Sequence, residues 1–161
     1  MKKYISNLST SFTFMDEALN LAQKAYEAGE VPVGAIIVST NDKIISSATN
    51  CKENSNDPCA HAEIIAIRAA SKSIGDWRLT EMRMYVTLEP CLMCLAAIKE
   101  ARLDGVIFAA YDLKGGAISL NYNFYNDKRL NHNFYVIGGI KSLESANLLS
   151  SFFQNKRGLK K

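Results

Sequence analysis

The sequence has no apolar run that approaches the roughly 18 residues needed to cross a lipid bilayer. Its N-terminal stretch, MKKYISNLSTSF, contains two lysines but lacks the apolar segment and small-residue cleavage site of a secretory signal. Both absences argue against a membrane protein and against an exported one. They predict a cytoplasmic protein, in which cysteine thiols stay reduced.

Cysteine and histidine are scarce, with four and two residues in a chain of 161. In a reducing compartment, a few cysteines are more typical of a metal or redox site than of a disulfide framework. Cys91 and Cys94, in the stretch LEPCLMC, form a C-x-x-C pair. A zinc ribbon needs a second such pair, and the sequence has none. A thioredoxin-like redox pair remains an alternative at this point.

Internal repeats, low-complexity blocks and linkers rich in proline or glycine are also absent. The length and the 48% hydrophobic content therefore predict a single domain over residues 1–161. No acidic residue follows Glu144, so the chain ends in a basic tail over 154–161 and has a net charge of +3. Such a tail suits a polyanion such as nucleic acid, although a solvated C-terminus has the same composition.

The spacing of apolar residues predicts alternating helices and strands. A first helix is expected over about 14–28, after an N-terminal extension over 1–13, with Thr13 as its N-cap and Gly29 at its end. Further helices are expected over 60–73, 91–103 and 142–157. Strands are expected over 33–40, 43–50, 83–90, 104–112 and 134–140.

The order of these elements indicates the fold class. A hairpin comes first, and strands then alternate with helices, which describes an α/β sandwich built on one mixed sheet. The strands are almost continuously apolar, so the sheet is expected to be covered on both faces. In the helix over 60–73, Ile64, Ile67 and Ala70 are expected to face the core.

The C-x-x-C pair lies where a helix is expected to begin. The helix dipole and the unpaired backbone N–H groups lower the pKa of a thiol in this place. Cys91 and Cys94 share one helical face and can supply half of a tetrahedral zinc site. His61, in DPCAHAE, also lies at the start of an expected helix. Because helix starts that follow strands gather at one edge of a parallel sheet, His61 can become the third ligand.

Three protein ligands leave the fourth zinc position open to water, as in catalytic sites. Zinc lowers the pKa of bound water from about 15.7 to about 7, so hydroxide is available at neutral pH to attack an electron-poor carbon. Glu63 is close enough to His61 to carry protons to a ring nitrogen and to a leaving amine. Together, HAE (61–63) and PCLMC (90–94) form the signature of the zinc nucleobase deaminases.

Stretches beyond this signature narrow the choice among deaminases. They are EVPVGAIIV (30–38), NDPCAHAEIIAIR (56–68), MYVTLEPCLMC (84–94), YDLKGGA (111–117), LNH (130–132) and LLSSFF (148–153). With them, the chain resembles the bacterial tRNA-specific adenosine deaminases from about Phe14 to the C-terminus. The resemblance implies a cytidine-deaminase-like three-layer α/β/α sandwich with a five-stranded mixed sheet. It also implies a homodimer, with one zinc per subunit, that hydrolyses the wobble adenosine of a tRNA anticodon to inosine.

The resemblance also implies a role for each matching residue. Zinc is held by His61, Cys91 and Cys94, and protons are carried by Glu63. Contacts to the RNA are implied for Asn50 at the base or its sugar, Asp112 at the anticodon backbone, Lys114 near phosphate, and the aromatic pair Phe152 and Phe153. From the residues alone, Asn50 is equally a strand end, Asp112 a turn residue, and one of the two phenylalanines a core residue.

Some positions fall outside the family pattern. Cys59 replaces the usual threonine or small residue, Tyr111 replaces a common arginine, and Ile118 and Ser119 lie in a divergent loop. Cys59 is expected to be a buried free thiol rather than an alternative ligand. His132 is expected to be a structural loop residue, and Cys51 has no assigned role.

Three rival functions remain at this stage. The first is a zinc deaminase of a free base or nucleotide of the guanine or cytosine type, which would use the same zinc and Glu63. The second is a catalytically silent zinc fold that binds RNA or a protein, but loss of the glutamate would mark it and Glu63 is present. The third is a thiol redox protein, which explains neither His61 nor Glu63.

Overall fold

The computed structural model of the chain describes residues 8–158. Part of the expected N-terminal extension (1–7) and the last residues of the basic tail (159–161) lie outside the described residues. The elements are, in chain order, α1 (Leu8–Glu27), β1 (Gly34–Ser39), β2 (Ile44–Thr49), α2 (Lys52–Ser55), α3 (Ala62–Ile74), β3 (Met82–Leu88), α4 (Leu92–Glu100), β4 (Gly105–Ala110), the 3₁₀ turn η1 (Phe124–Asn126), β5 (Tyr135–Gly138) and α5 (Ser142–Gly158).

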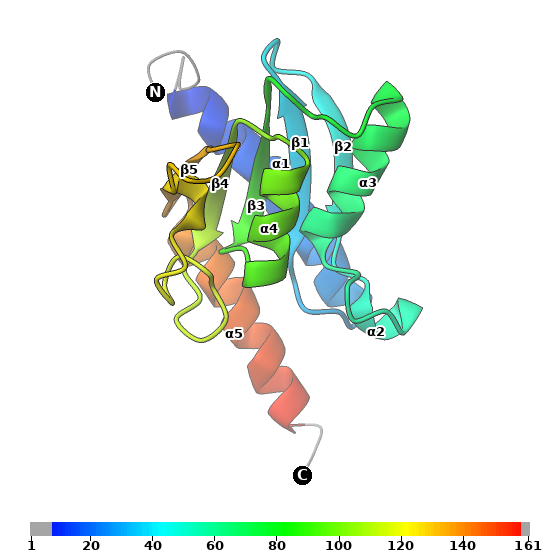
Figure 1. Cartoon of the computed structure of the whole chain (residues 1–161). Helices are drawn as coiled ribbons and strands as arrows, with labels where there is room; N and C mark the ends of the chain where they lie inside the picture. The colour runs from blue at the N-terminus through cyan, green and yellow to red at the C-terminus, as the bar shows by residue number, and fades with distance from the viewer. Residues whose placement is uncertain (1–7, 159–161) are drawn as a thin grey trace.

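A five-stranded mixed sheet forms the centre of the molecule, in the order β2-β1-β3-β4-β5 (Figure 1). β1 pairs antiparallel with both β2 and β3. β3 pairs parallel with β4, and β4 pairs parallel with β5. The mixed sheet expected from the order of the elements is therefore confirmed, and its parallel half is the part that follows β3.

Helices cover both faces of this sheet and complete the expected α/β/α sandwich (Figure 1). α3 and α4 lie on one face, and α1 and α5 lie on the other. Successive strand residues point to opposite faces. Ile37 and Met84 therefore pack beneath α3 and α4, whereas Ile36 and Tyr85 pack against α1. Of the helices between residues 8 and 158, none is both long and apolar enough to cross a membrane.

Helix α1 begins at Leu8 rather than at Phe14, so the expected N-cap is wrong. Thr13 lies inside the helix, where its hydroxyl donates to the backbone carbonyl of Ser9 at 3.2 Å. The first turns, LSTSF, are mostly polar, and apolar periodicity gives no signal for such a stretch. The end of the helix at Gly29 agrees with the prediction, because Gly29 adopts a left-handed conformation with a φ of 78°.

Helix α3 presents a different face to the core from the one expected. Its buried stripe contains Ala62, Ala66 and Ala70, each with no exposed surface. Of the three residues expected to face the core, Ala70 is fully buried and Ile67 is half-buried against the core, whereas Ile64 is half-buried and lies outside it. Small side chains allow α3 to pack closely on the sheet, and the two isoleucines line the groove beside α4.

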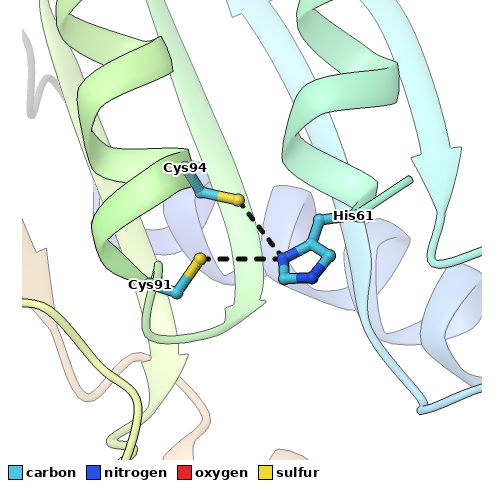
Figure 2. A group of neighbouring side chains, drawn as sticks. All are labelled: His61, Cys91 and Cys94. Atoms are coloured by element: carbon cyan, nitrogen blue, oxygen red, sulfur yellow. Dashed lines mark hydrogen bonds between the residues drawn. The ribbon is translucent and has the colours of Figure 1, made fainter. Parts of the chain in front are cut away.

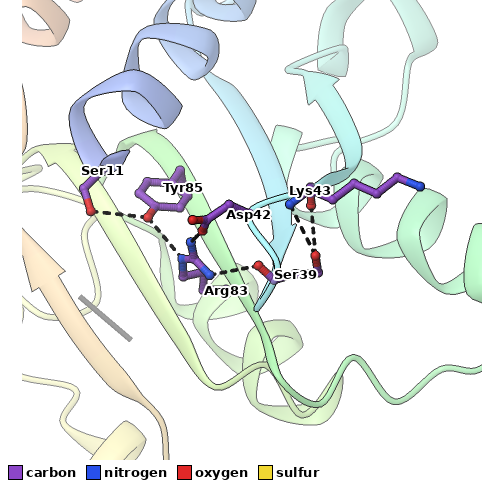
Figure 3. Close-up of polar contacts among 6 residues, drawn as sticks. All are labelled: Ser11, Ser39, Asp42, Lys43, Arg83 and Tyr85. Atoms are coloured by element: carbon purple, nitrogen blue, oxygen red, sulfur yellow. Dashed lines mark hydrogen bonds and ion pairs between the residues drawn. The ribbon is translucent and has the colours of Figure 1, made fainter. Parts of the chain in front are cut away.

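A buried arginine ties the β1–β2 turn to β3 (Figure 3). The Arg83 guanidinium donates to the backbone carbonyl of Ser39 at 3.0 Å and to the hydroxyl of Tyr85 at 3.1 Å, and it forms an ion pair with Asp42. Only 6% of Arg83 is exposed. Because Arg83 lies near the start of β3, this network stabilises the end of the sheet opposite to the end of β3 at Leu88.

Candidate metal centre and substrate pocket

Two helix N-termini meet near the carboxyl end of β3. His61 is the N-cap residue of α3, and Cys91 is the N-cap residue of α4. Both have extended backbone dihedral angles, so each side chain leaves the chain at the point where helical hydrogen bonding begins. Cys94 follows one turn later in α4 and is fully buried. The expectation that each half of the signature opens a helix is therefore confirmed.

These three side chains converge on one point (Figure 2). The Nδ1 atom of His61 lies 3.7 Å from the Cys91 sulfur and 3.5 Å from the Cys94 sulfur. A tetrahedral zinc with ordinary Zn–S and Zn–N bonds places sulfur and nitrogen ligands about 3.5 Å apart. All three ligand atoms lie within 4.8 Å of one another. The donor set and its spacing therefore fit zinc, and they leave one tetrahedral position free of protein ligands.

The electrostatics of the trio favour a bound cation. Hydrogen bonding from the Cys94 thiol, and then from His61, lowers the pKa of Cys91 to about 4. The same pairing with Cys91, together with burial, raises the pKa of Cys94 above its ordinary value. A hydrogen bond to Cys91 also raises the pKa of His61. One thiolate is therefore present at neutral pH without a metal, and a metal ion would displace the remaining protons.

Glu63 lies in the first turn of α3 and is 4% exposed. Burial is the largest cause that raises the pKa of Glu63, to about 7. Among the residues that the structure describes, its Oε2 atom has no hydrogen-bond partner. A buried polar atom without a partner is costly unless it serves a ligand. Glu63 therefore has a free carboxylate oxygen beside the ligand trio, and its pKa lies near neutral pH, as a proton carrier requires.

A pocket opens over the trio and brings together residues that are far apart in the sequence. Its lining consists of Val31, Val33, Asn50, Lys52, His61, Glu63, Leu88, Glu89, Cys91 and Asp112. Asn50, at the end of β2, and Asp112, after β4, were both expected at the substrate and both line this pocket. Their contacts with a substrate remain predictions. Val31, Val33 and Leu88 supply an apolar wall on which a flat ring can pack.

Glu89 holds the loop that carries Asp112, and sequence reasoning assigned it no role. Its buried carboxylate accepts hydrogen bonds from the backbone N–H of Asp112 at 2.9 Å and from the backbone N–H of Ser119 at 2.6 Å. A side chain on Gly116 would collide with this carboxylate. The Asp112 carboxylate in turn accepts from the backbone N–H of Lys114 at 3.0 Å. The only sequence feature that could have indicated a role for Glu89 was its position directly before the PC motif.

The remaining RNA-contact residues expected from the sequence lie outside the pocket lining. Lys114 is exposed on the loop after Asp112. Phe152 is buried and packs edge-on against Tyr26, with ring centroids 5.5 Å apart. Phe153 is 45% exposed. Of the aromatic pair, Phe152 is therefore a core residue, and Phe153 is the ring that is exposed to solvent.

The structure also shows the surroundings of the two cysteines and the histidine that lie outside the signature. Cys59 is exposed, so the expectation that it is buried is wrong. Its backbone N–H donates to the Asp57 carboxylate at 2.8 Å, and this tight turn directs the thiol outward. Cys51 is the half-buried N-cap of α2. His132 lies in a loop and bonds through Nε2 to the Leu103 backbone carbonyl at 2.8 Å, in agreement with a structural role.

Comparison with known proteins gives matches over most of the chain. The profile of the cytidine and deoxycytidylate deaminase zinc-binding region matches residues 8–110. The tRNA-specific adenosine deaminase of Haemophilus influenzae is 44% identical over 147 residues, which cover 91% of this chain and 85% of that protein. A structure from a study of A-to-I editing by tRNA deaminases at the wobble position superimposes with a TM-score of 0.80 at 41% identity, and covers 85% of this chain and 99% of that chain. The guanine deaminase of Bacillus subtilis superimposes with a TM-score of 0.60 at 34% identity, and covers 91% and 92% of the two chains.

Proposed function

We propose that this chain, which belongs to the family of the tRNA-specific adenosine deaminases, hydrolyses the wobble adenosine of a tRNA anticodon to inosine. The observation that carries the proposal is the free Oε2 atom of Glu63 beside three ligand atoms spaced for zinc. The reaction consumes one water and releases one ammonia, so protons must move between three atoms. A single buried carboxylate with an unoccupied oxygen suits that task.

His61, Cys91 and Cys94 would hold one zinc ion. When bound, zinc supplies the Lewis acidity that makes a water nucleophilic near neutral pH. Glu63 takes a proton from the attacking water and delivers it to N1 of the adenine ring as the oxygen adds to C6. Glu63 then transfers the second water proton to the amino group, which leaves as ammonia. Burial of Glu63 keeps bulk water from exchanging these protons.

The shape of the pocket favours a base that has left its stack. Its apolar lining consists of Val31, Val33 and Leu88, and its polar lining includes Asn50 and Asp112. An anticodon loop presents unstacked bases, so little energy is needed to bring one into the pocket. Phe153 is exposed for stacking on a neighbouring base, which contributes about 1–3 kcal/mol where it occurs. We also propose a cytoplasmic location, as expected for a protein that acts on tRNA.

A second copy of the chain is proposed as the partner of the groove between α3 and α4. The groove is lined by Ile64, Ile67, Arg68, Ser71, Trp77, Ala97, Glu100 and Ala101. Trp77 is 51% exposed at the edge of this apolar groove, with the Arg78 guanidinium 4.3 Å from its ring centroid. An apolar groove with Arg68 and Glu100 both present can meet its own copy across a two-fold axis. A homodimer is also what the resemblance to the tRNA-specific adenosine deaminases implies.

The function is tested by measuring inosine in an anticodon stem-loop with adenosine at the wobble position, with zinc-loaded protein. Free adenosine, guanine and cytosine are assayed in parallel. A stem-loop in which the same adenosine is base-paired serves as the matched control. Inosine at the unpaired wobble position alone is the expected result. Deamination of a free base with an unchanged stem-loop would contradict the RNA substrate and leave the zinc chemistry in place.

Deamination of free guanine is the alternative, and the similarity to the Bacillus subtilis guanine deaminase favours it as the second candidate. The same zinc ligands and the same glutamate would serve that reaction. The two substrates differ in salt dependence. Binding of an RNA weakens steeply as salt rises because phosphate contacts release counterions. Binding of a neutral base does not.

A further inference from the structure

Glu30 is a buried carboxylate that the chemistry described above does not use. It follows the end of α1 and is 1% exposed. Its position is fixed by the helix end, since the N–H of Gly29 donates to the Tyr26 carbonyl at 3.0 Å and the N–H of Glu30 donates to the Ala25 carbonyl at 2.9 Å. This pattern of paired bonds is the Schellman motif. The carboxylate therefore extends from a backbone with little freedom to move.

Each oxygen of the Glu30 carboxylate accepts one hydrogen bond. Oε2 accepts from the side-chain Nδ2 of Asn50 at 3.1 Å. Oε1 accepts from the backbone N–H of Asn54, in the short helix α2, at 2.7 Å. An ionised carboxylate has acceptors only, so it can bond only the NH₂ end of an amide. Glu30 therefore determines which end of the Asn50 side chain faces it.

The opposite end of Asn50 then becomes the one available to the pocket. Asn50 lines the pocket together with His61, Glu63 and Asp112. With Nδ2 turned toward Glu30, the carbonyl Oδ1 is left for a ligand. We propose that Glu30 is a positioning residue, which locks the Asn50 amide so that the substrate meets a hydrogen-bond acceptor. The matching substrate group is a donor, such as a ribose hydroxyl or a ring N–H, and this step rests on the proposed function of the pocket.

A glutamine at position 30 reverses this polarity without changing shape. The backbone N–H of Asn54 still requires an acceptor, so the glutamine carbonyl oxygen takes that place. The glutamine NH₂ then faces Asn50, whose amide must rotate to offer Oδ1. As a result, Asn50 presents an N–H donor to the pocket. We expect Glu30→Gln to lower kcat/KM by about 10- to 100-fold, the range for loss of an outer-shell partner, with zinc content unchanged.

A double variant that exchanges the carboxylate and the amide between positions 30 and 50 should restore activity. In Glu30→Gln with Asn50→Asp, the glutamine NH₂ donates to one oxygen of the aspartate and the other oxygen is again an acceptor toward the pocket. The net charge of the pair equals that of the natural pair. We expect the double variant to recover most of the activity lost in Glu30→Gln. A residue that only stabilised α2 would give no such recovery.

The activity assay uses the substrate that the unaltered protein deaminates, which is the wobble-adenosine stem-loop or, failing that, free guanine. Glu53→Gln is the matched control, because Glu53 is an exposed carboxylate on α2 and its loss leaves the Glu30–Asn50 bond intact. In an Asn50→Ala background, Glu30→Gln should add no loss beyond about twofold, since coupled residues are not additive. Additive losses, or full activity in the single glutamine variant, would overturn the inference.

A second measurement tests the hydrogen bond between Glu30 and Asn50 without an activity assay. In NMR spectra of the zinc-loaded protein, the side-chain NH₂ signals of Asn50 should shift and exchange faster with solvent in Glu30→Gln than in the unaltered protein. Glu53→Gln should leave these signals unchanged. Identical Asn50 signals in Glu30→Gln and the unaltered protein would overturn the inference. An inactive unaltered protein with the expected NMR change would contradict the proposed function and leave the positioning role of Glu30 supported.

Discussion

At the scale of single residues, the site combines one thiolate, one buried thiol, one imidazole and one carboxylate in a small volume. The charges differ in origin, because the Cys91 thiolate is favoured by its hydrogen bonds whereas burial opposes ionisation of Glu63. A cation at the centre of the trio compensates the thiolate and leaves Glu63 free to exchange protons. The proposed roles of metal ligand and proton carrier thus fall to groups whose ionisation is controlled in opposite ways.

Replacement of Glu63 by glutamine should remove activity and leave the metal site intact. Glutamine has the same shape but cannot accept and return a proton. We expect kcat to fall by about 10²- to 10⁴-fold, the usual contribution of a general acid–base group, with an unchanged zinc content by elemental analysis. Activity close to that of the unaltered protein would rule out Glu63 as the proton carrier.

Zinc affinity should fall as the pH is lowered. The pKa of Cys94 is raised above its ordinary value by its hydrogen bond to Cys91 and by burial, so Cys94 holds a proton at neutral pH that zinc must displace, whereas Cys91, with a pKa of about 4, is already ionised above pH 5. Linkage then predicts an affinity that weakens about tenfold per pH unit for each displaced proton. Competition with a chelator at about pH 6 and about pH 8 measures this. Equal affinities at the two pH values would contradict it.

The sequence predicted that His61, Cys91 and Cys94 lie beside Glu63, as they do in the structure, because short motifs carry these residues. It gave no role to Glu89 or Glu30, since each acts on residues at least 20 positions away through backbone or amide N–H groups. No spacing rule connects such pairs until the fold is known. The exposure of Cys59 was also missed, because it depends on a local turn at Asp57 rather than on hydrophobicity.

At the scale of elements, the alternation of apolar runs predicted every strand and the four long helices to within a few residues, apart from the start of α1. The polar first turns of α1 and the short elements α2 and η1 have no apolar period to detect. The face of α3 was misjudged because larger residues were expected to point inward. Close packing of α3 on the sheet instead requires alanine at Ala62, Ala66 and Ala70.

Replacement of Arg83 by methionine should destabilise the protein without reducing its catalytic rate. The change leaves the Ser39 carbonyl and the Tyr85 hydroxyl without this donor, at a cost of about 1–3 kcal/mol each if they stay buried. Arg83 and Leu88 are separated along β3 by roughly 16 Å, so the pocket is unaffected. Thermal unfolding and initial rates at a temperature below the transition measure the two effects. A normal melting temperature, or a reduced initial rate, would contradict this prediction.

At the scale of the whole molecule, the groove between α3 and α4 is the surface through which we propose that two copies of the chain associate. Ile67→Asp places a charge in the groove and should convert the proposed dimer into a monomer, because burying an unpaired carboxylate at an interface is costly. Light scattering measures the mass, and Arg68→Gln, at the polar edge of the same groove, is the milder comparison. A monomeric unaltered protein would contradict the proposed dimer, and an Ile67→Asp variant that remains dimeric would place the interface elsewhere.

The position of the metal ligands on two different helices has a consequence for the order of folding. Cys91 and Cys94 lie one turn apart, so they are close together as soon as α4 forms. His61 reaches them only after β1 has paired with β3, a contact between distant segments that forms slowly during folding. A nascent chain can therefore offer two thiols early, but it can complete the three-ligand site only once its sheet is assembled. We therefore expect zinc binding by all three residues to follow the pairing of β1 with β3, so that a chain without this pairing has only the two thiols to offer.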